Sequence, residues 1–134
     1  MKKYAHLKLK VLTEKFSYVL FDNLSEANLA IGQMTSSYNY ALFVSAEEIS
    51  AIVPSKLNAR YVKEEPDWVC IRIIGEMPFG TVQGLIAEIS GALISHSLGL
   101  CVVSTFKTDW FFIKQKNVDK AIDALKEIGW ELIS

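Results

Sequence analysis

The segment "GLIAEISGALISHSLGLCVVSTFKTDWFFIK" (Gly84–Lys114) decides the fold, because it places a helix and two strands in immediate succession. Residues 84–97 repeat apolar side chains at three- and four-residue spacing, which predicts one buried face of a helix. These apolar residues are Leu85, Ile86, Ile89, Leu93 and Ile94. Residues 99–104 and 110–115 have the composition of β-strands. The bend between them, "STFKTDW" (Ser104–Trp110), gathers hydroxyls, an aromatic ring and one carboxylate.

The flanking sequence extends this pattern in both directions. "WVCIRIIG" (68–75) predicts a strand, followed by a loop that contains Pro78 and Gly80. Beyond the segment, Asn117 resembles the N-cap of a helix that Gly129 ends, and "WELIS" predicts a last short strand. The order β-α-β-β-α-β is that of a ferredoxin-like α+β unit, with two helices on one face of an antiparallel sheet.

The first half is less regular but follows a related order. "HLKLKVL" and "FSYVLF" predict two strands separated by a bend at Thr13–Lys15. Asn23 is expected to cap a short helix that Gly32 ends, and "YALFVS" and "ISAIVP" predict a hairpin closed by Pro54. The stretch 54–67 is interpreted as the connection between the halves.

Together the halves predict two tandem units, an abbreviated one over 1–63 and a complete one over 64–134. A weak internal repeat supports this division. The separation from Ser45 to Ser50 equals that from Ser104 to Asp109, and each pair lies at a bend between two strands.

Composition excludes several classes of protein. The chain has 134 residues, 51% of them hydrophobic and 22% charged, with a net charge of -1, which is typical of folded soluble proteins. No apolar run is long enough to cross a membrane and the start does not resemble a signal peptide, so we expect a cytoplasmic protein. The balanced charge argues against nucleic-acid binding.

Catalytic and metal-binding patterns are not found in the sequence. Cys70 and Cys101 lie inside apolar runs, and buried free thiols are favoured over a disulfide or a metal pair. His6 and His96 are expected to have structural or surface roles. Since no nucleophile with a partnering base and no glycine-rich phosphate loop is present, we expect neither an enzyme nor a cofactor.

The bend and the helix start together suit an α-amino acid. Backbone N–H groups of Gly84, Leu85 and Ile86 at a helix N-terminus would favour its carboxylate. Asp109 would accept from its ammonium, with Thr105 and Phe106 beside it. Two alternatives remain at this point: Asp109 could cap its own turn, and Phe106 could belong to the core or to an interface. Trp110 and the two following aromatic residues are expected to serve core and subunit packing.

The second half also resembles a known family. The runs "FGTVQGLIAEISGALISHSLGLCVVSTFKTDWFFIK" and "AIDALKEIGWEL" are similar to the C-terminal half of small tandem ACT-domain proteins, a group that includes the CASTOR-type cytosolic arginine sensors. Those proteins carry a Gly-Ile/Leu-x-Ala helix start and a Ser-Thr-Phe/Tyr-x-Thr-Asp-aromatic hairpin. Gly84–Ala87 and Ser104–Trp110 match these two motifs.

The resemblance implies where a ligand would bind. It assigns the amino-acid pocket to Gly84, Leu85 and Ile86 together with Thr105, Phe106 and Asp109, and places Ser50 and Ala51 on the other wall if the pocket lies between the units. Gln83 departs from the small or hydroxyl residue usual before the glycine, which puts pocket size in doubt.

The function expected from the sequence is that of a sensor or regulatory protein that binds a free amino acid. Its expected partners are that ligand, a second copy of the chain in a homodimer and an unidentified protein that responds to binding. The alternative is a protein-interaction or oligomerisation module that has no small ligand.

Overall fold

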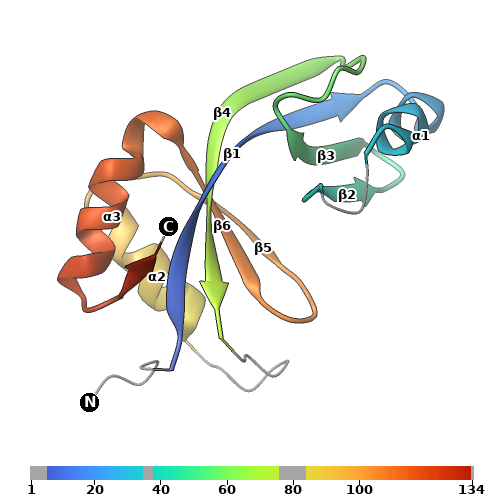
Figure 1. Ribbon diagram of the computed structural model, residues 1–134. Coiled ribbons are helices and arrows are strands. Elements are labelled where there is room, and N and C mark those ends of the chain that lie inside the picture. The colour runs from blue at the N-terminus through green and yellow to red at the C-terminus, as the bar shows by residue number, and fades with distance from the viewer. Residues whose placement is uncertain (1–5, 35–37, 76–83, 134) are drawn as a thin grey trace. The chain divides into compact units, whose positions relative to one another are not determined.

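The computed structural model describes residues 6–34, 38–75 and 84–133, and Figure 1 shows its elements. The loop expected over 76–83, with Pro78 and Gly80, lies outside the described residues. In chain order the elements are β1 (Lys8–Phe21), α1 (Leu24–Gly32), β2 (Ala41–Val44), β3 (Ile49–Pro54), β4 (Lys63–Ile74), α2 (Leu85–Ile94), β5 (Cys101–Ser104), β6 (Asp109–Lys114), the 3-10 turn η1 (Gln115–Asn117), α3 (Val118–Glu127) and β7 (Leu132–Ile133).

The chain divides into two compact units. The larger unit comprises Met1–Thr13 and Val69–Ser134, and the smaller unit comprises Glu14–Trp68. Strands β1 and β4 each contribute residues to both units. The sequence predicted a single division between residues 63 and 64, whereas here the first part of β1 belongs to the larger unit.

The larger unit has the predicted α+β architecture. Its strands follow the order β1-β4-β6-β5, and β7 pairs in parallel with the start of β1, so that Leu9 lies opposite Leu132. Helices α2 and α3 lie on the same face of this sheet (Figure 1). The core between them is formed by fully buried side chains of both layers, including Leu9, Ile71, Ile89, Phe111 and Leu125.

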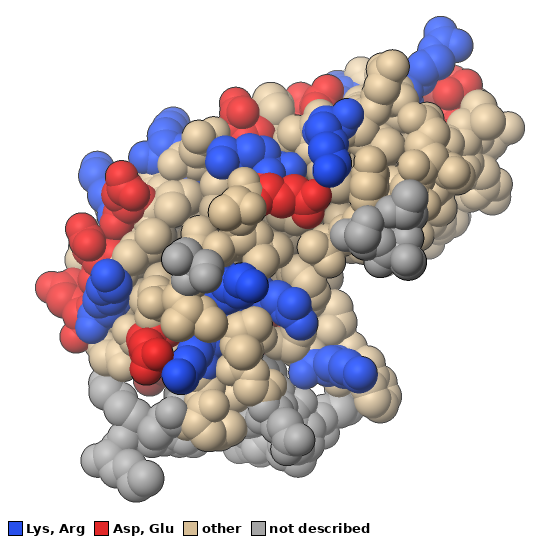
Figure 2. Space-filling view, viewed as in Figure 1, with Lys and Arg blue, Asp and Glu red and all other residues tan. Residues whose placement is uncertain are grey.

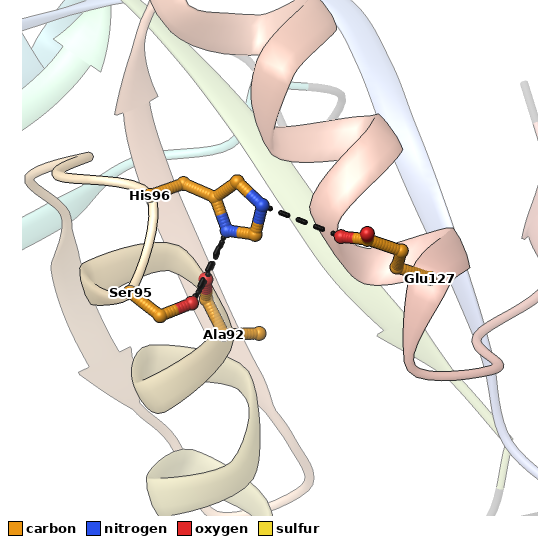
Figure 3. A network of polar contacts seen from close by, with 4 residues as sticks. All are labelled: Ala92, Ser95, His96 and Glu127. Atoms are coloured by element: carbon orange, nitrogen blue, oxygen red, sulfur yellow. Dashed lines mark hydrogen bonds and ion pairs between the residues drawn. The ribbon is translucent and has the colours of Figure 1, made fainter.

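The ends of the two helices are joined by the side chain of His96, which follows α2 (Figure 3). Its Nδ1 lies 3.0 Å from the carbonyl oxygen of Ala92, and its Nε2 lies 3.3 Å from a carboxylate oxygen of Glu127 on α3. Ser95 Oγ donates to the same Ala92 oxygen at 2.7 Å. Since both members of the His96–Glu127 pair are largely exposed, the pair contributes at most about 1 kcal/mol.

The smaller unit has a single helix in its described residues, and in this sense is abbreviated. Its strands follow the order β2-β3-β1-β4, and β1 pairs with β3 in antiparallel register from Phe16 opposite Pro54 to Phe21 opposite Ile49. Helix α1 begins as predicted, because the Oδ1 atom of Asn23 accepts from the N–H of Glu26 at 2.9 Å. The separate core of this unit consists of Val19, Phe21, Ala27, Ala30, Ala51 and Val53.

Two sequence expectations about strands are wrong. The bend predicted at Thr13–Lys15 does not form, and β1 continues through it as a 14-residue strand. The segment lacks glycine, proline and asparagine, and its threonine is β-branched, so it has strand preference rather than turn chemistry. The connection expected over 54–67 ends earlier, because its last residues belong to β4, which begins at Lys63. These added strand residues are exposed, and apart from one proline they are charged, so they did not resemble a strand.

Cys70 and Cys101 do not form a disulfide in the part of the chain that the structure describes; Cys70 is buried and Cys101 is half-buried. Among the residues that the structure describes, no helix is long and apolar enough to cross a membrane.

Candidate functional site

The bend between β5 and β6 is closed by Thr105. Its N–H donates to the carbonyl oxygen of Thr108 at 2.8 Å, and its hydroxyl both donates to that oxygen at 2.9 Å and accepts from the N–H of Thr108 at 3.2 Å. The hydroxyl of Thr108 donates in turn to the carbonyl oxygen of Ile73 on β4, at 3.4 Å. The bend is therefore fixed internally and attached to the end of β4.

Asp109 is the first residue of β6 and is 7% exposed. Alternate residues of a strand share a face, so Asp109 lies on the same face as Phe111 and Ile113, both of which pack beneath the helices. Within the described part of the chain, its carboxylate forms no hydrogen bond or ion pair. Thr105, not Asp109, caps the bend, so the alternative that Asp109 caps its own turn is not realised.

Helix α2 begins with open backbone donors. Its N-cap is Gly84, which has a φ of 77° and offers no side chain to the helix N–H groups. The first helical hydrogen bond is donated by the N–H of Glu88 to the carbonyl oxygen of Gly84, at 2.8 Å. A positive φ is readily adopted by glycine and strains other residues. The N–H groups of Leu85 and Ile86 belong to the unpaired first turn that favours an anion.

These features occur at one end of the larger unit. Figure 1 shows the start of α2, the end of β4 and the β5–β6 bend at the same end of the sheet. The bond from Thr108 to Ile73 attaches the bend to β4 at this point. The Asp109 carboxylate and the N-terminus of α2 thus lie at the same end of the sheet. The first can accept hydrogen bonds and the second can donate them, a combination that suits a zwitterion.

Comparisons with known proteins agree with this architecture. A family model described as an ACT domain matches residues 63–127. The chain has the ACT-domain fold. The protein Atu0741 of Agobacterium tumefaciens has a similar structure, with a TM-score of 0.79 at 23% identity, covering 96% of this chain and 92% of that one. No curated protein matches the sequence.

Two further solved structures share the fold at lower identity. A protein of unknown function and possible transport protein from Vibrio cholerae has a TM-score of 0.65 at 14% identity, covering 91% of this chain and 89% of that chain. The regulatory subunit of aspartate kinase from Thermus thermophilus, in a ligand-free form, has a TM-score of 0.61 at 10% identity, covering 89% and 95% of the two chains. The likeness to these solved structures extends beyond residues 63–127 to nearly the whole chain.

The smaller unit contains a second bend of the same construction, between β2 and β3. The N–H of Ser45 donates to the carbonyl oxygen of Glu48 at 2.9 Å, and the Ser45 hydroxyl accepts from the N–H of Glu48 at 3.1 Å. Ser45 therefore corresponds to Thr105. The registers, Val44 opposite Ile49 and Ser104 opposite Asp109, make Ile49 the counterpart of Asp109.

This correspondence corrects the repeat read from the sequence by one residue. The sequence matched Ser45 with Ser104 and Ser50 with Asp109. A shift of one residue moves a side chain to the other face of a strand, so the second bend has an aliphatic residue where the first has a carboxylate.

The remaining predicted site residues have different surroundings. Leu85 is 2% exposed and belongs to the core, so only its backbone could contact a ligand, while Ile86 is partly exposed. Phe106 is 79% exposed, which excludes a place in the core and leaves an interface or a ligand wall. Ser50 and Ala51 lie on β3 of the smaller unit, and their part in a site stays a prediction.

Thr108 was missing from the predicted site, although the quoted bend contains it. Its buried hydroxyl links the bend to β4. Figure 2 shows acidic and basic side chains interspersed among uncharged ones on part of the viewed face, so neither sign forms one continuous surface there.

Proposed function

We propose that the chain is a sensor or regulatory protein that binds a free amino acid at this end of the larger unit. The observation that carries the proposal is the burial of Asp109, without a described partner, at the end of the sheet where α2 begins. A buried carboxylate favours a cationic partner, and an ammonium group supplies one.

The other parts of the ligand have matching groups. The N–H groups after Gly84 would hold the α-carboxylate, while Thr105 and Thr108 keep the bend in place. Phe106 would cover the side chain of the ligand. A regulatory role is supported by the ACT-domain match and by the structural likeness to a regulatory subunit of aspartate kinase. The narrower likeness to arginine sensors remains a hypothesis about which amino acid binds.

Binding regulates only if the ligand prefers one arrangement of the protein over another. A partner protein or a second copy of the chain would then respond to the preferred arrangement. Strand β2 is an edge strand with exposed apolar side chains, Leu42, Phe43 and Val44, and such edges readily pair with other strands.

A thermal-shift screen against the twenty amino acids at millimolar concentration tests the proposal. A ligand present at 100 times its Kd adds about 2.7 kcal/mol to the free energy of unfolding. We expect a selective rise in Tm for one amino acid or one chemical class. A Tm that no amino acid changes would contradict the proposal.

The exposure of Phe106 favours a second candidate function, an interaction module without a small ligand. In that case the change Phe106→Ser would alter the oligomeric state measured by light scattering, and no amino acid would shift Tm. For the sensor, the same change would weaken ligand binding.

A further inference from the structure

The face of the larger unit's sheet that lies away from α2 and α3 carries two adjacent cations, which the proposed function does not use. On β4, Ile71 and Ile73 pack beneath the helices, so Arg72 between them lies on the opposite face. On β1, Leu9 and Val11 likewise pack against the helix-side core, which places Lys10 on the opposite face as well.

Lys10 and Arg72 are also neighbours across the strands. β1 and β4 are adjacent in the sheet and run in opposite directions (Figure 1). Gly75 lies against Leu7, since a Cβ atom at Gly75 would meet the Leu7 side chain at 2.7 Å. Counting three residues from this contact along each strand places Lys10 opposite Arg72, where Cβ atoms are about 5 Å apart.

The guanidinium of Arg72 is incompletely satisfied. Its Cζ lies 4.8 Å from the centre of the Trp110 ring on β6, so the group stacks on an aromatic face. The ring offers no hydrogen-bond acceptor in the plane of the guanidinium, and the buried Nε atom has no hydrogen-bond partner among the described residues. A buried donor without an acceptor is rare in folded proteins and indicates a missing partner.

No described side chain supplies a counter-charge to this pair. In the described part of the chain, neither Lys10 nor Arg72 forms an ion pair. The nearby Lys8 is already paired with Glu131, at 3.2 Å. Like charges directly opposite each other on a sheet are destabilising, so two such cations side by side need an anion.

We propose that Lys10 and Arg72 form an oxyanion-binding site on the helix-free face, distinct from the amino-acid site. Its ligand is a carboxylate or phosphate group of a small anionic molecule. The planar fork of Arg72 would bind two oxygens of that group, Lys10 would supply the second charge, and Trp110 would hold the guanidinium in its plane.

Calorimetric titration of the full chain with inorganic phosphate and with succinate tests this site. Each titration is repeated with chloride at equal ionic strength, which separates binding from screening. We expect saturable binding of at least one of the two anions and none of chloride. Saturation by phosphate alone, or by succinate alone, identifies the oxyanion that the site accepts.

Variants place the binding on the named residues. Arg72→Met and Lys10→Met should each weaken binding at least tenfold, whereas Lys120→Met, which removes an exposed cation from α3, should leave it unchanged. Asp109→Asn should also leave anion binding unchanged, which separates this site from the proposed amino-acid site. If Arg72→Met does not fold, Lys10→Met alone decides.

Two results would overturn the assignment. One is the absence of saturable binding of both anions by the unmodified protein. The other is anion binding of unchanged affinity in folded Arg72→Met or Lys10→Met.

Discussion

Replacing Asp109 by asparagine tests both the stability and the binding role of this residue. The substitution preserves shape and removes the charge. Because no described hydrogen bond or ion pair of the carboxylate would be lost, we expect the free energy of unfolding without ligand to change by less than about 1 kcal/mol. Since a charge-assisted hydrogen bond contributes about 1.5–3 kcal/mol, we expect the Kd for the amino acid to rise between about tenfold and about 150-fold.

The effect is readily measured as a ligand-induced change in stability. At a concentration 100 times the Kd of the unmodified protein, the ligand adds about 2.7 kcal/mol to its free energy of unfolding. A variant with a Kd raised about 100-fold would gain only about 0.4 kcal/mol at the same concentration. Thermal melts with and without ligand therefore distinguish the two proteins, and titration calorimetry gives the two Kd values directly.

The matched control is Glu47→Gln, which removes an exposed carboxylate from the second bend. It should leave both stability and ligand binding unchanged. The reasoning would be refuted by an Asp109→Asn protein that binds the ligand as tightly as before. A loss of about 2 kcal/mol or more of unfolding free energy without ligand would also refute it, because the carboxylate would then have a structural partner.

Three further predictions follow from the described contacts. Thr105→Val removes both side-chain hydrogen bonds that close the bend, so the free energy of unfolding measured in urea should fall by about 1–3 kcal/mol. Burial, and secondarily the charge of Glu64, raises the pKa of Tyr61 above 10.0. Above about pH 10 the folded chain therefore keeps a proton that the unfolded chain loses, so the free energy of unfolding should fall as the pH rises. The fall should be smaller in the Tyr61→Phe variant. Calorimetry should find one amino-acid site per chain, because Ile49 replaces Asp109 in the second bend; two sites would contradict this correspondence.

The elements that local chemistry specifies could be predicted from sequence. Helix α2 followed from its apolar spacing, and α1 from Asn23, whose side chain does cap it. The long β1 strand was missed because the polar residues around Glu14 resembled a turn. The pairing of Leu9 with Leu132 brings the start of the chain beside its end, and no local pattern contains such a contact.

The sequence named candidate residues for the site but not their geometry. The quoted bend contained Thr105 and Asp109, but their different roles depend on structure. Thr105 closes the bend, while Asp109 begins the next strand on the face beneath the helices. The sequence did not predict a site at Arg72. Whether its Nε finds a hydrogen-bond partner depends on which side chains the neighbouring strands place around it.

The two bends show how one chain could combine a binding unit with an abbreviated one. Their closing hydrogen bonds are alike, so the backbone of this motif does not depend on ligand binding. The first bend has Asp109 where the second has Ile49. The starts of helices α2 and α1 also differ. At the start of helix α1 the side chain of Asn23 accepts from the N–H of Glu26, while α2 begins at Gly84 with no side-chain cap. The smaller unit has no carboxylate at the position of Asp109, and the first turn of its helix is capped by a side chain, so it lacks both groups that would bind a zwitterion. Selection for ligand binding would therefore act on the larger unit alone.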